Sequence, residues 1–234
     1  GTLDVDETLT LSGALSQGGA ITIDVASGKT LTYSGAAVNL GAYTLTMSGE
    51  GRLSNSNDLV LNNASSKLLL SSSITVDSVS TSADSLGLDV DANSTLSSLT
   101  VAHTTPVSIA SGKTLSGAIT VTAGSIKLDE AGTLGSTVSM SGGTLDVDES
   151  MTLSGKLSQL GDYEIDVASG KTLTEYTGWG IRLGANTLTL SGGGTLSNTN
   201  AFALNHADSK LLLNSITVAK VSTSANNSGL DVNA

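Results

Sequence analysis

Hydrophobic and polar residues alternate through most of this chain, in short runs that are separated by turn residues. Leu, Ile or Val takes one place and Thr, Ser or Asp the next, which is the pattern of a strand with one buried and one exposed face. Gly, Asn, Asp and Ser interrupt the runs, and no helical periodicity is sustained over three turns. The pattern predicts strands without helices, most clearly at residues 2–6, 8–12, 20–25, 29–33, 43–47, 59–62, 73–80 and 86–91.

The pattern repeats on two length scales. Residues 2–92 recur as residues 144–234, which defines a unit of about 142 residues, and residues 93–143 complete the first unit. A shorter motif, Val/Ile-Ala-Ser-Gly-Lys-Thr-Leu, begins at Val25, Ile109 and Val167, at spacings close to multiples of about 20. Residues 1–234 are therefore predicted to form one continuous all-β fold, a single-stranded parallel β-helix (β-solenoid) with about 20 residues per coil. We expect right-handed crossovers, and 11 or 12 coils would make a rod about 55 Å long.

The two copies indicate which positions face inward. Positions that keep an aliphatic residue in both copies are predicted to be buried, and positions that change size or charge are predicted to be exposed. The inward set is Leu3, Leu31, Leu45, Leu61, Val76 and Leu88, with their partners Leu145, Leu173, Leu188, Leu204, Val218 and Leu230. The outward pairs are Ala36 and Trp179, Asn39 and Arg182, Asn63 and His206, and Thr22 and Glu164.

Composition narrows the functional classes. The chain has 27 Gly, one Pro and 3% aromatic residues, which suits a thin aliphatic core. A net charge of −11 argues against nucleic acid as a partner, because phosphates attract clustered Lys and Arg. There is no cysteine, so disulfides and thiolate metal sites are excluded. Neither a leader nor an apolar run of membrane-spanning length is present, so no membrane insertion is expected. The chain begins in mid-pattern at Gly1, which recurs as Gly143, so we expect it to be an excised fragment.

Acidic pairs are the first candidates for chemistry. Asp4 with Asp6, Asp89 with Asp91, and Asp146 with Asp148 are each two residues apart, with Glu7 and Glu149 beside them. If neighbouring coils aligned their carboxylates, they could bind calcium or hydrolyse a glycoside. No calcium-loop motif is present, however, and Asp91 becomes Asn233 in the second copy. The simpler interpretation is a set of solvated acids on the outer face.

Thr-x-Thr triplets raise a second hypothesis. They are Thr8 with Thr10, Thr30 with Thr32, Thr44 with Thr46, Thr172 with Thr174, and Thr187 with Thr189. Outward threonine ladders resemble those of antifreeze proteins, in which a flat array matches ice. Coil lengths vary here, and Asp, Ser and Lys replace Thr at comparable positions, so β-propensity is the simpler explanation. Turn residues that could stack as amide ladders, with a structural role, are Asn55, Asn57, Asn62, Asn198, Asn200 and Asn205.

The other motifs give weaker indications of function. His103 and His206 have no neighbouring ligand spacing, and no GxSxG elbow occurs. The glycine-rich run at residues 191–195 lacks the spacing of a phosphate-binding loop and is predicted to be a turn. One local cluster looks like a contact surface, Tyr176, Trp179 and Arg182, and in the first copy its places are taken by Tyr33, Ala36 and Asn39. The sequence predicts no catalytic, cofactor-binding or metal-binding residues, no cofactor and no enzyme activity.

The runs VASGKTLT, NTLTLSGGGTLSN and SKLLLNSITV resemble the β-solenoid repeat regions of giant bacterial surface and secreted proteins, of the filamentous-haemagglutinin and autotransporter-passenger kind. The resemblance covers essentially the whole chain, as pattern and composition. It implies an extracellular stalk or fibre for adhesion or cell–cell contact, with a protein or glycan partner at a cell surface. Uncapped strand edges further predict end-to-end self-association. A carbohydrate-binding or carbohydrate-cleaving β-helix, and an ice-binding solenoid, are the alternatives.

Overall fold

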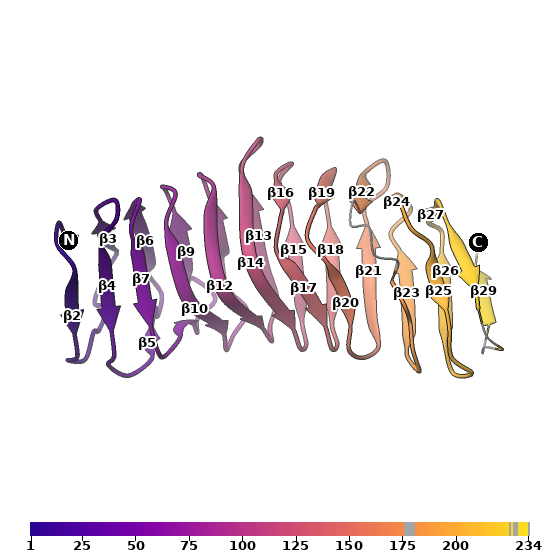
Figure 1. The fold of residues 1–234 in the computed structure, drawn as a ribbon, viewed down its shortest axis with the longest axis horizontal. Helices are drawn as coiled ribbons and strands as arrows, with labels where there is room; N and C mark the ends of the chain where they lie inside the picture. Colours follow the sequence, from indigo (N-terminus) through magenta and orange to yellow (C-terminus); the bar gives the residue numbers. More distant parts are fainter. Residues whose placement is uncertain (176–180, 225, 227–228, 234) are drawn as a thin grey trace.

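The computed structural model describes residues 1–175, 181–224, 226 and 229–233, which form strands and turns with no helix among them. The strands stack in sequence order into a rod, with the two termini at opposite ends (Figure 1). The predicted fold class is confirmed, because the chain is an all-β parallel β-solenoid of about 11 turns with about 20 residues per turn. The handedness stays a prediction. The described part of the chain contains no helix that is long and apolar enough to cross a membrane.

Sheet 1 takes one strand from every coil, and its neighbouring strands are parallel throughout. In spatial order its strands are β1 (Thr2–Val5), β3 (Ile21–Val25), β6 (Thr44–Gly49), β9 (Lys67–Leu70), β11 (Gly87–Val90), β13 (Thr105–Ile109), β15 (Ser125–Leu128), β18 (Thr144–Val147), β21 (Tyr163–Val167), β23 (Thr187–Ser191), β26 (Lys210–Asn214) and β29 (Gly229–Asn233).

Sheet 2 covers the other side of the core. Its main path is β2 (Leu9–Leu11), β4 (Thr30–Tyr33), β7 (Arg52–Asn55), β10 (Thr75–Thr81), β12 (Ser94–Val101), β14 (Thr114–Val121), β16 (Thr133–Leu134), β19 (Met151–Leu153), β22 (Thr172–Glu175), β24 (Thr195–Asn198) and β27 (Thr217–Val218). Four short strands extend it, namely β5 (Val38–Asn39), β8 (Leu59–Leu61), β17 (Thr137–Met140) and β20 (Leu157–Gln159). A separate pair consists of β25 (Phe202–Leu204) and β28 (Val221–Thr223).

The Ala-Ser-Gly-Lys motif is the turn that joins the two sheets in three coils. The Lys29 amide donates to the Ala26 carbonyl at 3.0 Å, and the same bond recurs at Lys113 and Lys171 at 2.9 Å. The glycine of each turn has a φ of 72°, 72° or 75°, a region that favours glycine because it has no Cβ. The recurrence of the motif therefore reflects the geometry of a tight turn.

The core is one continuous column of aliphatic side chains between the sheets. Most predicted inward positions are confirmed as buried, namely Leu31, Leu45, Leu61, Val76, Leu88, Leu145, Leu173, Leu188 and Leu204. Leu3 and Val218 are half-buried and pack against the core. The prediction for Leu230 is wrong, since its side chain is 47% exposed. Its strand β29 has a neighbour on one side only, so no following coil covers it.

The predicted outward positions are confirmed where the structure describes them. Five of these side chains are exposed, namely Ala36, Asn39, Asn63, Arg182 and His206. Thr22 and Glu164 occupy equivalent places on the outer face of sheet 1, in register with Thr2 and Thr144, and are half-buried. Trp179 and Tyr176 lie outside the described residues, so the predicted cluster with Arg182 stays a prediction.

The structure changes which residue of the second copy is equivalent to Tyr33. Tyr33 pairs with Leu11, and Glu175 pairs with Leu153 at the equivalent place, so Glu175 and not Tyr176 occupies the position of Tyr33. Both side chains point inward and are buried. Strand alternation fixes this position on the inner face, so the extra residue of the second copy falls after the strand.

Candidate functional site

The first acid of each pair, Asp4, Asp89 or Asp146, lies on the outer face of sheet 1, as predicted, and two of the three pairs contribute ion pairs between coils. Asp146 is on β18, and Asp148 lies just beyond the end of the same strand. The Lys127 ammonium on β15 lies 3.8 Å from the Asp146 carboxylate and makes a closer ion pair with Asp148. The hydrogen bond that Lys127 donates to Asp148, more than any other interaction, raises the pKa of Lys127. The two carboxylates thus share a face and a cation.

Other acids repeat this arrangement along the rod. Lys67 pairs with Asp89 on the adjacent strand, and Lys210 pairs with Asp231 at 2.9 Å. At the turns, Lys29 lies 2.5 Å from Glu7 in the first copy, and in the second copy the equivalent distance, from Lys171 to Glu149, is 2.6 Å. Because each of these pairs joins consecutive coils, their most direct role is to tie the coils together. As half-exposed pairs they contribute at most about 1 kcal/mol each.

Burial raises the pKa of the Asp146 carboxyl above its ordinary value of 3.8. Lys127 opposes this shift, while Asp148, Asp166 and Glu164 add to it because they are like charges. Between the ordinary and the raised pKa, the folded chain holds a proton that the unfolded chain has released. The ionised carboxylate therefore destabilises the fold increasingly as pH rises through this window, and the penalty is fully present above it.

We therefore expect Asp146→Asn to raise the melting temperature at pH 7, by the equivalent of less than about 1 kcal/mol. The gain should shrink as the pH falls through the raised pKa and vanish below the ordinary value of 3.8, where the carboxyl is protonated in both the folded and the unfolded chain. Melting curves of both proteins from pH 8 down to below that value measure this. Asp148→Asn is the matched control and should lower the melting temperature at pH 7, because Lys127 loses its closer partner. A less stable Asp146→Asn variant at pH 7 would contradict the expectation.

The described residues contain no group of three or more His, Asp or Glu side chains arranged to hold a metal ion. Asp4 lies in register with Asp24, and Asp146 with Asp166, so neighbouring coils do align single carboxylates. These rows are also engaged by hydroxyl groups, for example from Ser191 to Asp166 at 2.7 Å. Calcium binding and glycoside cleavage at the acids stay untested hypotheses.

The asparagines have the predicted structural role, although through backbone contacts instead of amide ladders. The Asn55 amide donates to the carbonyls of Asn57 at 2.9 Å and Ser78 at 2.7 Å, and Asn198 does the same in the second copy. The Asn62 side chain accepts the Gly41 amide of the preceding coil at 2.8 Å. Asparagine thus satisfies backbone groups where the strands end.

The remaining motifs are structural where the structure describes them. The His206 ring accepts the Asp208 amide at 3.1 Å within one exposed turn, and His103 lies in a turn between strands. The glycine-rich run is the predicted turn, between β23 and β24, with φ values of 99° at Gly192 and 78° at Gly193. Neither histidine contributes to a converging set of polar side chains among the described residues.

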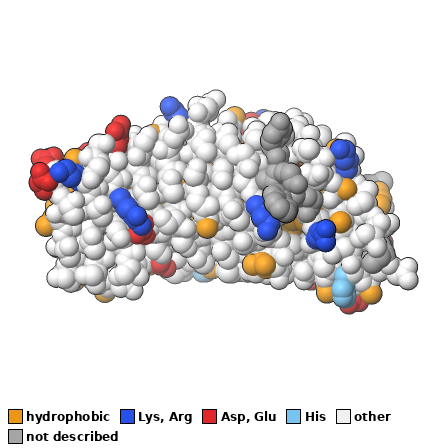
Figure 2. Space-filling view, in the orientation of Figure 1, with side chains coloured by type: hydrophobic (Ala, Val, Ile, Leu, Met, Phe, Trp, Pro, Cys, Tyr) orange, Lys and Arg blue, Asp and Glu red, His pale blue; other side chains and the backbone are white. Residues whose placement is uncertain are grey.

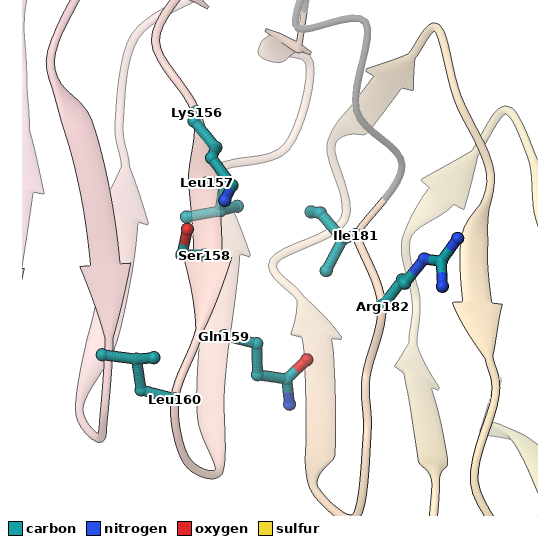
Figure 3. A pocket seen from close by; sticks show the side chains of 7 residues that line it. All are labelled: Lys156, Leu157, Ser158, Gln159, Leu160, Ile181 and Arg182. Carbon is teal, nitrogen blue, oxygen red and sulfur yellow. The ribbon is translucent and has the colours of Figure 1, made fainter.

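A hollow of about 310 Å³ lies beside β20 in sheet 2. Strand β20 pairs with β17 on one side, and none of the described residues pairs with its other edge. Figure 3 shows the Ile181 side chain pointing towards β20, whereas the Arg182 side chain extends away from it. The lining residues are Lys156, Leu157, Ser158, Gln159, Leu160, Ile181 and Arg182. One lysine, an amide and a hydroxyl at the hollow suit a polar ligand, and Leu160, 63% exposed, adds an apolar contact.

The first copy shows which of these residues belong to the scaffold. Its equivalents of Lys156, Leu160 and Arg182 are Ala14, Gly18 and Asn39, so both cations are specific to the second copy. The glutamine is shared, and Gln17 donates to the Thr44 carbonyl at 2.8 Å. The sequence marked Arg182 through its change from Asn39, whereas Lys156 was missed although its change from Ala14 was a visible signal. The carbohydrate-binding alternative stays a prediction for this hollow.

The two sheets differ in the chemistry of their outward positions. Sheet 1 carries most of the charged side chains on strands, including Asp4, Asp24, Lys67, Asp89, Lys127, Asp146, Glu164, Asp166, Lys210 and Asp231. Sheet 2 carries hydroxyl residues, which we call the hydroxyl face, namely Thr10, Thr30, Thr32, Ser54, Thr75, Thr95, Ser97, Thr114, Ser116, Thr133, Thr152, Thr172, Thr174, Thr195, Ser197 and Thr217. Its described outward strand positions hold one ion pair, Arg52 with Asp77 at 2.8 Å. Figure 2 shows this side of the rod, with few charges over its middle.

These features define a parallel β-solenoid with one charged face, one hydroxyl face and a hollow beside β20. The chain matches no protein-family model, and the comparisons with curated proteins and with solved structures found no match.

Proposed function

We propose that this chain is a rigid spacer within a long extracellular repeat protein of bacteria, where the solenoid serves as a stalk or fibre for adhesion or cell–cell contact. The observation that carries the proposal is the continuity of the core and of sheet 1, which runs unbroken through twelve strands. Each internal coil is hydrogen-bonded to both neighbours, so bending the rod would break many parallel bonds together. The resemblance to surface-protein repeat regions supports the extracellular setting.

Spin labels test whether the chain is a rigid spacer. The absence of cysteine allows two labels to be placed uniquely, at Thr8→Cys, just before β2, and at Thr217→Cys, on β27, at opposite ends of the rod. Ten coil steps of about 4.8 Å separate the two labels, so double electron–electron resonance should give a narrow distance distribution near 48 Å. A broad distribution in native buffer, like that in denaturant, would contradict the rigid spacer.

Antibody labelling of intact producing cells tests whether the chain is extracellular. Labelling that appears only after lysis of the cells would exclude an extracellular location.

We further propose that this chain, taken by itself, associates end to end. Among the described residues, β1 pairs with β3 alone and β29 with β26 alone, and β29 exposes Leu230 and Val232, the latter by 68%. Unpaired strand edges with apolar side chains favour pairing with another chain. Light scattering after size exclusion should show a mass that rises with concentration, and less so for Val232→Lys. A constant monomer mass at every concentration would contradict it.

A further inference from the structure

The hydroxyl face carries a regular array despite the unequal coils. Along one row, Thr114, Thr133, Thr152, Thr174 and Ser197 lie in register on consecutive strands. A second row runs beside it through Thr172, Thr195 and Thr217. The differences in coil length are taken up by the turns, so the strands keep their alignment. The irregularity expected from coil lengths is therefore absent from these rows.

Strand propensity does not explain the difference between the two faces. Both sheets need residues that favour strands, yet charges are frequent on sheet 1 and nearly absent from sheet 2. The Thr-x-Thr triplets divide accordingly. Thr30 with Thr32 and Thr172 with Thr174 belong to the hydroxyl face, whereas Thr44 with Thr46 and Thr187 with Thr189 are on sheet 1, in register with Lys67 or Lys210 and with leucines.

The spacing and charge of the hydroxyl rows limit the kind of partner that this face can bind. Neighbouring strands repeat at about 4.8 Å, and alternate residues along a strand at about 6.6 Å, so the hydroxyls form a two-dimensional lattice on a rigid support. The nearly uncharged lattice matches an uncharged, periodic partner. No aromatic side chain is among its outward positions, so it lacks the stacking platform that sugar rings or bases would use.

A hollow of about 230 Å³ lies among the hydroxyls of Thr133, Ser150, Thr152, Thr172 and Thr174. This is room for several water molecules at about 30 Å³ each. Waters held there by hydroxyl groups would take the spacing of the strands, and their ordering cost would be reduced because the sheet is already rigid.

We propose that the hydroxyl face binds ice. Threonine supplies a hydroxyl that can hydrogen-bond to lattice water and a methyl group that packs against it, and the strand rows repeat both in register. The face is nearly uncharged, and the hollow between its rows has room for several water molecules. Both features favour crystalline water over a polysaccharide or a polyanion. This binding does not rest on the spacer role, because it needs only the folded rod.

Ice affinity and thermal hysteresis of the full chain test the proposal. The wild type, carrying a fluorescent label, should enter a growing ice hemisphere and lower the freezing point below the melting point. Thr152→Lys places a long cation in the centre of a row and should reduce the hysteresis by about fivefold or more, since central residues dominate a binding surface. The matched control Thr189→Lys makes the same change on sheet 1 and should keep the wild-type hysteresis. Melting curves confirm that both variants fold.

Several results would overturn the proposal. One is a wild type that is excluded from ice and shows no hysteresis, and another is an equal loss in the two variants. Retention on crystalline cellulose or chitin without ice affinity would assign the face to a polysaccharide instead. If Thr152→Lys does not fold, Thr95→Lys in the other half of the face takes its place, with Thr75 and Ser116 as its row neighbours.

Discussion

Replacing Val76 with aspartate is expected to unfold the middle of the rod. Val76 is fully buried on β10, where it stacks between Leu53 and Leu96 of the neighbouring coils. A carboxyl group there would lose its hydration without gaining a partner, at a cost of roughly 2 to 7 kcal/mol beyond the lost burial of the valine. Each coil contacts only its neighbours, so the damage should be centred on this coil. Limited proteolysis should cut near residue 76 and leave two protected fragments.

The adjacent residue provides the control for this prediction. Thr75 points outward from the same strand and lies in register with Arg52. Thr75→Asp therefore introduces the same charge, hydrated and next to a cation, and should change the free energy of unfolding by no more than about 0.5 kcal/mol. Similar proteolysis of the two variants would show that the core of this coil is not as closely packed as the structure indicates.

Replacing Gly49 with alanine is expected to cost about 3 to 5 kcal/mol, from backbone strain and overlap with the preceding coil. Gly49 has a φ of 80°, and a Cβ there would overlap the carbonyl group of Val25. The overlapped atoms are backbone and belong to the sheet 1 ladder, so they cannot move without loss of strand pairing. Denaturant unfolding should show a large shift of the midpoint.

Gly28 separates the two causes. Its φ of 72° is similar, but a Cβ would meet nothing within 4 Å. Gly28→Ala should therefore cost only about 1 to 2 kcal/mol, which is the strain alone. The difference between the two variants measures how closely the coils approach each other. Equal midpoints for the two variants would be inconsistent with the close approach at Gly49.

Much of the candidate chemistry could be located from sequence, but its partners could not. The alternation placed Asp146 on an outer face, because side chains on a strand point to opposite sides in turn. It could not show that Lys127, nineteen residues earlier in the chain, lies in register with it, since that depends on the length of each turn. The hollow at β20 was missed because its lining comes from two coils, and the sequence does not show which residues of neighbouring coils lie side by side.

The strand positions, the inward aliphatic rows and the repeating turn could be predicted from sequence, because each follows from local alternation or from a glycine that a tight turn requires. Which strands share a sheet and which residues share a row depends on how the coils stack. Coils of unequal length bring residues 19 to 25 positions apart into register, as with Lys127 and Asp146 or Asp166 and Ser191. The separation into a charged face and a hydroxyl face therefore emerges only when the coils are stacked, since pairing between coils is a long-range interaction.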